Sequence, residues 1–234
     1  MVAGACATNK RFNFILSFFV LIVSPWSLYK TRPLADNFAV APSNSKVHMN
    51  TLSTSAQTAL LVIDVQQSFM RMPFWCADEL PSFQQALLRL DAGCRAAGVP
   101  VVHIFHEGQS GPFRADSGWV KPMDWLPGAP AVTFTKHVHN SFTDTGLDLW
   151  LRRQGVQRLI ISGIRTEQCC ETTARVGSDL GYAVDFVSEA TLTFPMTHAA
   201  SGRTFSAQEI VTRTELVLAN RFARIVSVDA CLSQ

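Results

Sequence analysis

The sequence predicts an α/β fold, a three-layer sandwich whose central, mostly parallel sheet holds about six strands. Short apolar runs rich in valine and isoleucine, typical of buried strands, alternate with longer segments whose apolar residues recur at helical spacing. Strands joined through helices pair in parallel with right-handed crossovers, so helices cover both faces of the sheet. The chain has 234 residues, 47% of them hydrophobic, which suffices for one such domain with an appendage.

Six apolar runs account for the predicted strands. The first, Ala59 to Ile63, contains no polar residue and ends at Asp64, as a buried strand would. Each later run is followed by a glycine, a polar residue or a proline-rich loop, which marks its end. The predicted strands are residues 59–63, 99–105, 131–135, 157–162, 182–187 and 223–228.

Helical segments fill most of the gaps between the strands. From Phe83 to Leu90, apolar side chains recur at helical spacing, and a glycine closes the segment, as it commonly does in helices. A segment with four glycines, four prolines and two tryptophans is too irregular for this pattern, and its length is typical of a functional loop. The predicted helices are residues 80–98, 146–153, 169–180 and 207–220, and the predicted loops are 107–130 and 190–205.

Residues 1–48 differ from the rest of the chain. They carry a net charge of +4, which leaves about −2 for residues 49–234. The apolar run from Phe12 to Val23 follows two basic residues; it resembles a signal-peptide core and is short for a membrane span. A third interpretation is that the protein starts at Met49 and that the preceding sequence is upstream sequence translated in frame. The chain is therefore predicted to hold a leader with a linker at 1–48 and one globular domain at 49–234.

Composition excludes several function classes. The globular part has no basic patch and the chain shows no nucleic-acid-binding motif, so nucleic acid is not a predicted partner. The six cysteines include no C-x-x-C pair and no framework spacing, so disulfides are not expected to hold the fold. Reduced thiols favour a cytoplasmic location, although the apolar leader leaves secretion or membrane anchoring open. The expected partner is a small-molecule substrate.

Three reactive side chains come at or just after predicted strand ends. Asp64 follows the first strand, Lys136 follows the third, and Cys169 lies in the first turn of the helix after the fourth, which is predicted to start at Thr166 and Glu167. Loops from adjacent parallel strands converge at one edge of the sheet, so the three are predicted to share a crevice. There an aspartate can take a thiol proton, a lysine can stabilise anions, and the helix N-terminus is expected to lower the thiol pKa. Each residue alone also fits a structural role, as a cap, a solvated lysine or a small core residue.

Three segments resemble the signatures of one enzyme family. They are LLVIDVQQSF at residues 60–69, Lys136 with the Asn-Ser-Phe at 140–142, and GIRTEQCCETTA at residues 163–174. Together, and in this order, they resemble the isochorismatase-like cysteine hydrolases, which include nicotinamidases and N-carbamoylsarcosine amidase. The resemblance covers about residues 58–230. Its most specific part is the spacing G-x-x-T-x-x-C, because that spacing places the nucleophile.

The resemblance implies a role for each matching residue. Cys169 would be the nucleophile, Asp64 the general base and Lys136 the third member of a catalytic triad. A non-proline cis peptide typical of the family would join Ile164 to Arg165. The backbone N–H groups of Arg165 and Cys169 would then form the oxyanion hole. The fold would be the Rossmann-like, isochorismatase-like hydrolase fold, and a homo-oligomer is implied as well.

The reaction implied is hydrolysis of a C–N bond in a small amide, carbamoyl compound or ureide through a thioester. Isochorismatase-type hydrolysis of a vinyl ether needs no thiol, and family members that perform it typically lack the cysteine. That reaction and a catalytically silent module that binds a small metabolite are the alternatives. A redox role for Cys169 and Cys170 would need a vicinal disulfide, which adjacent cysteines rarely form without strain.

No metal and no cofactor are predicted. The nicotinamidase metal site needs an Asp-x-His group, whereas this chain reads HIFHE at residues 103–107. His137 and His139 lack a third ligand, and His103 is predicted to pack in the core. The chain also has Glu167 where the family more often has aspartate. The residues predicted to contact substrate, from their positions along the chain, are Phe69, Trp75, His106, Trp119 and Phe142.

Overall fold

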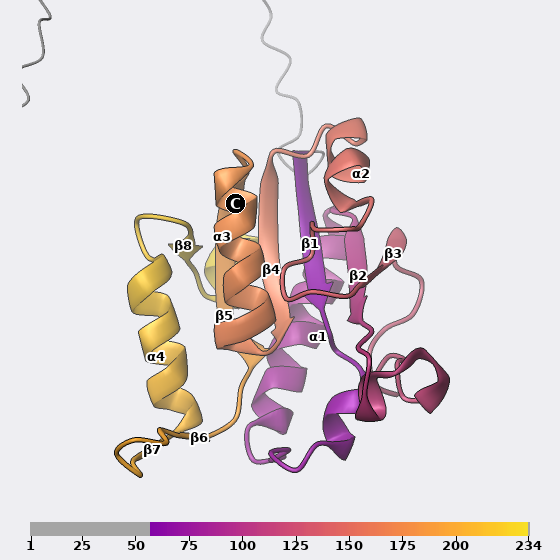
Figure 1. Cartoon of the computed structure of the whole chain (residues 1–234). Coiled ribbons are helices and arrows are strands. Elements are labelled where there is room, and N and C mark those ends of the chain that lie inside the picture. Colours follow the sequence, from indigo (N-terminus) through magenta and orange to yellow (C-terminus); the bar gives the residue numbers. More distant parts are fainter. Residues whose placement is uncertain (1–56, 234) are drawn as a thin grey trace, which may run out of the picture. The chain divides into compact units, whose positions relative to one another are not determined.

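A parallel sheet of six strands organises the protein. The computed structural model describes residues 57–233, so the predicted leader at 1–48 lies outside the described residues. The strands are β1 (Thr58–Ile63), β2 (Val101–His106), β3 (Val132–Lys136), β4 (Arg158–Ile164), β5 (Ala183–Leu192) and β8 (Arg224–Ile225). They lie in the order β3-β2-β1-β4-β5-β8, and every neighbouring pair is parallel (Figure 1). The predicted fold class is confirmed.

Helices cover both faces of the sheet, and each face has its own core. The helices are α1 (Leu80–Ala96), α2 (Leu147–Arg153), α3 (Glu171–Asp179), α4 (Ala207–Leu218) and α5 (Val228–Leu232). Along β1, Leu60 and Val62 pack with α1 and α5, whereas Leu61 and Ile63 pack with α2, α3 and α4. Figure 1 shows α3 in front of the sheet and α1 on its far side. This alternation is the two-residue period of a strand buried on both faces.

Two segments differ from the prediction. Residues 190–205 are predicted as a loop, but β5 extends to Leu192, and a short hairpin of β6 (Met196–Thr197) and β7 (Thr204–Phe205) follows. The extension forms because β5 resumes pairing with the end of β4 after a register shift, a tertiary contact without a sequence pattern. The predicted last strand is shorter than expected because the Ser227 side chain accepts a hydrogen bond from a backbone N–H and starts α5.

The described helices are short. The longest of them, α1, has 17 residues, and within residues 57–233 no helix is long and apolar enough to cross a membrane. The apolar run from Phe12 to Val23 lies outside that range. The three interpretations of the leader therefore stay predictions.

Gly163 sets the close approach of two strand ends at the functional edge of the sheet. It lies in β4 opposite Ile63, the last residue of β1. Its φ of 124° belongs to a region that residues with a Cβ avoid. A Cβ on Gly163 would lie 2.0 Å from the carbonyl oxygen of Ile63. Glycine is therefore required where the chain leaves β1 for Asp64 and leaves β4 for the turn that carries Cys169.

We expect Gly163→Ala to destabilise the fold by about 3 kcal/mol or more, because strain and overlap each cost on the order of 1–3 kcal/mol. Gly155→Ala is the matched control, since Gly155 also has a positive φ of 69° but a Cβ there would meet no atom within 4 Å. Its cost should be roughly 1–2 kcal/mol, from conformation alone. Urea unfolding measures both. Equal losses would show that the contact with Ile63 is not what requires glycine.

Candidate active site

The strand order reverses between β1 and β4, and the predicted reactive residues gather at that point. The chain runs from β1 through β2 to β3 on one side, and from β4 through β5 to β8 on the other. Open α/β sheets bind their ligands outside the carboxyl ends of the strands at such a switch point. Asp64 directly follows β1, Lys136 ends β3, and Cys169 lies a few residues after β4.

The three side chains form one contact group, which we call the triad. Lys136 Nζ lies 2.8 Å from Asp64 Oδ2 and 3.3 Å from Cys169 Sγ. The same nitrogen lies 3.2 Å from His106 Nδ1 and donates to the carbonyl oxygen of Val138 at 3.2 Å. The side chains of Lys136 and Asp64 are both 0% exposed. One ammonium group therefore neutralises the aspartate and reaches the sulfur at the same time.

A π-helical turn, Thr166–Cys170, carries the thiol and leads directly into α3. This corrects the prediction of one continuous helix over 169–180. Such turns are rare and are frequently found at functional sites. Cys169 lines a cavity, whereas Cys170 is 0% exposed and packs in the core beneath α3. Of the two adjacent cysteines, Cys169 is the one that a substrate can reach.

Burial and the lysine together set the resting charges of the triad. Burial raises the pKa of Asp64, and the Lys136 ammonium only partly opposes that change. Burial lowers the pKa of Lys136, but the negative partners Asp64 and Cys169 outweigh it, so that pKa is raised overall. Lys136 therefore stays protonated at neutral pH. Asp64 is a stronger base than a solvated carboxylate, which suits a residue that must accept a proton.

The thiol differs from the prediction. The helix N-terminus led us to expect a lowered pKa for Cys169, but burial raises that pKa. Asp64 raises it further, and Lys136 lowers it only in part. The physical reason is that ionised Cys169 would be a second buried anion beside a single cation. Cys169 therefore rests as a thiol, and a base must take its proton during attack.

His106 ends β2 and contacts the same ammonium. Burial first, then Lys136 and His139, lower the pKa of His106 to about 4, so the imidazole is neutral at pH 7. An ammonium can only donate, so Nδ1 is the acceptor and we assign the proton to Nε2. The Gln66 side chain holds the end of β2 through two hydrogen bonds with the backbone of His106. The His106 backbone N–H donates to Gln66 Oε1 at 2.7 Å, and Gln66 Nε2 donates to the His106 carbonyl oxygen at 2.9 Å.

The triad opens into a cavity of about 340 Å³. Ligand pockets in proteins measure roughly 300–1,000 Å³, so this one suits a small molecule. The rings of Phe69 and Phe113 meet edge to face with centroids 5.0 Å apart. Besides Asp64 and Cys169, the wall includes Phe69, Phe74, Phe113, His106, His139 and Arg165.

Known proteins share both the sequence pattern and the fold. The family model of the isochorismatase domain matches residues 58–215. The chain belongs to the isochorismatase family. Nicotinamidase 3 of Arabidopsis thaliana is 30% identical over 187 residues, 73% of this chain and 85% of that protein. Streptothricin hydrolase of Streptomyces noursei is 34% identical over 141 residues, 58% of this chain, and the match spans 50% of that protein.

Solved structures of the isochorismatase family have the same fold. A family protein from Burkholderia xenovorans is 30% identical with a TM-score of 0.69, and the match covers 76% of this chain and 86% of that one. One from Chromobacterium violaceum is 28% identical with a TM-score of 0.70, covering 77% and 94% of the two chains. The protein is thus a hydrolase of the isochorismatase family, as the resemblance implied.

The family's cis peptide between Ile164 and Arg165 is present, as the resemblance implied. It stands between β4 and the π-helical turn, directly before the segment that carries Cys169. The oxyanion-hole role of the Arg165 and Cys169 N–H groups stays a prediction.

Three of the five residues predicted to contact substrate lie outside the cavity wall. Trp75 packs on Phe194 with ring centroids 5.3 Å apart. The ring centroid of Trp119 lies 3.8 Å from Cζ of Arg71. Phe142 is buried in the core beneath α3. Tertiary packing decides which residues surround a ring, so nearness to a catalytic residue along the chain does not place that ring at the cavity. The other two predicted residues, Phe69 and His106, do line the cavity.

Several wall residues were not found from the sequence. Phe113 comes from the long segment 107–130, whose length did indicate a functional loop. Phe74 also comes from an irregular segment, where no periodic pattern assigns it to a core. The Arg165 side chain was missed because the resemblance drew attention only to its backbone. The usable signal for it was a charged residue inside the most specific motif.

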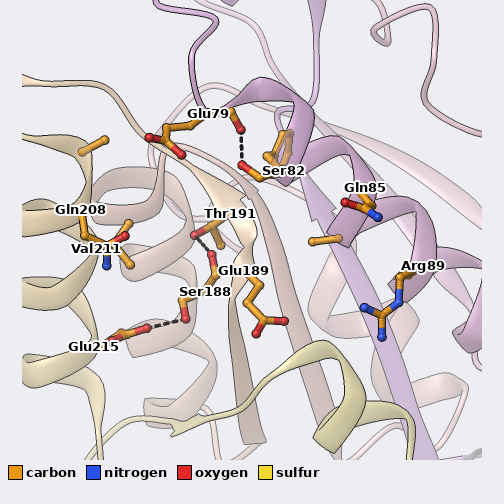
Figure 2. Close-up of a pocket in the computed structure, with 13 residues that line it drawn as sticks. Glu79, Ser82, Gln85, Arg89, Ser188, Glu189, Thr191, Gln208, Val211 and Glu215 are labelled. Carbon is orange, nitrogen blue, oxygen red and sulfur yellow. Dashed lines mark hydrogen bonds between the residues drawn. The ribbon is translucent and has the colours of Figure 1, made fainter.

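A second cavity lies between α1, β5 and α4 (Figure 2). Its volume is about 490 Å³, larger than that of the catalytic cavity. Two of its carboxylates are already engaged, since Glu215 accepts from Ser188 and Glu189 accepts from the Val228 N–H. Its lining holds no cysteine, histidine or lysine. Without a thiol, an imidazole or a lysine it is not a second catalytic site of the kind found at the triad.

The histidines near the triad do not form a metal-binding cluster with other possible metal ligands in the described part of the chain. Over residues 57–233, no group of three His, Cys, Asp or Glu side chains is placed to hold a metal ion. The rings of His106 and His139 stack, with centroids 6.4 Å apart and 9° between planes. His103 is buried in β2 as predicted. The expectation of a metal-free site stays a prediction.

A double-mutant cycle should separate the structural and catalytic roles of the buried ion pair. Lys136→Met or Asp64→Asn alone should cost roughly 3–5 kcal/mol of stability, because each leaves one buried group without its partner. Lys136→Met should lose more stability at pH 8 than at pH 5, since the lone Asp64 holds a proton that the unfolded chain releases. The double variant should regain most of the stability yet show no activity. Urea unfolding and a turnover assay measure the two; additive losses would contradict direct coupling.

Proposed function

We propose that this isochorismatase-family protein is a cysteine-dependent hydrolase that cleaves a C–N bond in a small amide, carbamoyl compound or ureide. One observation carries the proposal: Cys169 Sγ lies 3.3 Å from Lys136 Nζ, which lies 2.8 Å from Asp64. The thiol also lines the cavity. A nucleophile, a base and a cation in mutual reach are what acyl transfer through a thioester requires.

In the first half of the proposed reaction, one proton moves within the triad. As Sγ attacks the carbonyl carbon, Asp64 takes the thiol proton and then passes it to the leaving nitrogen, which departs as ammonia or an amine. Negative charge thereby shifts from the carboxylate to the sulfur and, as the bond between sulfur and carbon forms, to the carbonyl oxygen. Lys136 can neutralise the carboxylate and the sulfur because its Nζ contacts both groups. The N–H groups of Arg165 and Cys169 are the candidates for holding the oxyanion.

In the second half, water attacks the thioester carbonyl. Asp64 accepts a proton from that water and returns it to the departing sulfur, which regenerates the thiol and releases the acid. The raised pKa of Asp64 supports this role, because a base with a pKa nearer neutrality both accepts and returns protons efficiently.

Cavity size and one relative support a small amide substrate. A volume of about 340 Å³ leaves room for a small molecule and little more. The relative that matches over most of its length is a nicotinamidase, whose name gives an amide as its substrate. The streptothricin hydrolase matches over only 50% of its length, so its activity is not carried over.

Two alternatives remain within the same fold. A vinyl-ether hydrolase would not need a thiol in contact with a base and a cation, and here all three meet. A silent binding module would typically have lost one member of the triad, and the chain keeps each of them.

Two finer expectations stand as proposals beside the reaction. The described cysteines (Cys76, Cys94, Cys169, Cys170 and Cys231) are all free thiols, which supports a cytoplasmic protein. A homo-oligomer is proposed from the family resemblance, and light scattering on the purified protein would test it.

The first test of the reaction concerns the nucleophile. Cys169→Ser should lower ammonia release from the best substrate in a panel of small amides and ureides by at least about 100-fold. Cys170→Ala is the matched control and should keep most of the activity, since that side chain is buried away from the cavity. Mass spectrometry of the stalled wild-type reaction should show the acyl group on Cys169. Equal loss in both variants would undo the assignment.

The second test concerns metal independence. Activity should be unchanged after exhaustive chelation, because Lys136 supplies the positive charge that the proposed reaction needs. Alkylation of Cys169 by iodoacetamide should abolish activity. The measurement is ammonia release before and after each treatment. Loss on chelation that added zinc or iron restores would contradict the metal-free mechanism, and activity surviving full alkylation would contradict the thiol mechanism.

A further inference from the structure

We infer that an ion pair beside the triad, Arg165 with Glu167, makes the active site selective for uncharged substrates. The inference rests on the proposed function, in which Cys169 attacks a carbonyl group. Arg165 lines the catalytic cavity, and its Nη2 lies 2.9 Å from Glu167 Oε1, outside the cavity wall. The substrate class is a small neutral amide or ureide that carries an apolar or planar group.

The formal charges at the cavity cancel in pairs. Among the residues that line it, Asp64 and Arg165 are the ones with side chains charged at pH 8, where imidazoles are generally neutral. Lys136 neutralises Asp64 at 2.8 Å, and Glu167 neutralises Arg165 at 2.9 Å. A substrate carboxylate would therefore lose its hydration in this cavity without gaining an uncompensated cation as partner. A neutral amide loses much less on entering.

The Arg165–Glu167 pair is held from several sides. Cζ of Arg165 lies 4.9 Å from the Phe74 ring centroid and 5.6 Å from that of Phe194. Glu167 Oε2 accepts a hydrogen bond from Thr193 Oγ1 at 2.6 Å. The two charged side chains are only 9% and 10% exposed. Solvent therefore screens the pair weakly, and its charge balance is felt in the cavity.

The guanidinium keeps hydrogen-bonding capacity. Nε of Arg165 is buried and donates no hydrogen bond to any residue within 57–233. A guanidinium has five N–H donors, so pairing with one carboxylate oxygen does not exhaust them. Because Arg165 lines the cavity, a neutral acceptor such as a carbonyl oxygen or a ring nitrogen can use a guanidinium N–H that Glu167 leaves unpaired. The rings of Phe69, Phe74 and Phe113 on the same wall favour a planar group beside it.

The pair could also serve only as a brace for the turn that carries Cys169. A brace and a charge filter differ in one measurable property. Removing a brace slows all reagents alike, whereas removing one charge of a filter changes the preference between neutral and anionic reagents of equal size.

Iodoacetamide and iodoacetate are matched probes for this preference. In both, Sγ of Cys169 forms a bond to carbon, the carbon–iodine bond breaks, iodide leaves and Asp64 takes the thiol proton. They differ only in bearing an amide or a carboxylate. The alkylation rates of Cys169 in the full chain at pH 8, followed by peptide mass spectrometry, give a ratio that is normalised to free cysteine. Wild-type protein should prefer iodoacetamide.

Glu167→Gln leaves the Arg165 cation uncompensated. The ratio of the two alkylation rates should then shift toward iodoacetate by at least about 10-fold, because a weakly screened cation on the wall of the same cavity attracts the carboxylate. Arg165→Gln leaves Glu167 uncompensated and should shift the ratio the opposite way, which keeps the test decisive if one variant does not fold. Glu167→Asp keeps the pair, and the double change of Arg165 and Glu167 to Gln removes both charges, so both should stay near the wild-type ratio.

The outcomes distinguish this inference from the proposed function. If Cys169 is alkylated and the ratio is the same in wild type, Glu167→Gln and Arg165→Gln, the pair is only a brace and the inference fails while the thiol mechanism stands. If neither reagent alkylates Cys169 in the wild-type protein, the accessible nucleophile is lost, and the proposed function fails together with the inference.

Discussion

The buried ion pair of Lys136 and Asp64 is the interaction on which the rest of the active site depends. Two charges with no exposed surface are tolerated only in contact, because each would be strongly destabilised alone. Contact in turn requires the carboxyl ends of β1 and β3 to be held in a fixed relation by the strand between them. The parallel sheet with both faces covered supplies that rigidity, so the framework and the charge pair stabilise one another.

The ion pair of Lys136 and Asp64 also keeps the net charge of the active site constant during the proposed reaction. With Cys169 in reach of the same ammonium, the triad holds one cation and one anion, whether the proton lies on sulfur or on carboxylate. A proton can therefore move during the proposed reaction without changing the net charge of a buried site. The Arg165–Glu167 pair, whose two residues precede Cys169 in the same motif, repeats this arrangement of one cation with one anion. Two closed pairs leave the cavity neutral, and this is the basis for expecting neutral substrates.

Predictions that depend on a local sequence pattern agree with the structure, whereas features that depend only on contacts between distant segments were not predicted. The runs that became β1, β2 and β4 were predictable because strands buried on both faces must be continuously apolar. The end of β5 and the β6–β7 hairpin were not, because pairing between distant segments creates them without a local period. Asp64, Lys136 and Cys169 were predictable as neighbours because parallel topology brings strand ends together. Trp75, Trp119 and Phe142 are not among the residues that line the cavity, because an aromatic ring in a loop packs wherever tertiary space allows.

By itself the sequence determined the fold class and the order of the elements, because these depend on the local spacing of apolar residues. It also determined the family, because the family is identified by short motifs. Tertiary structure alone decided the protonation of the thiol. Position at a helix start predicts a lowered pKa for the Cys169 thiol, whereas burial next to Asp64 raises it. Tertiary structure also decided which of two adjacent cysteines faces the cavity and that Glu167 neutralises Arg165. Burial and electrostatics depend on every neighbour in space, and a linear sequence does not contain those distances.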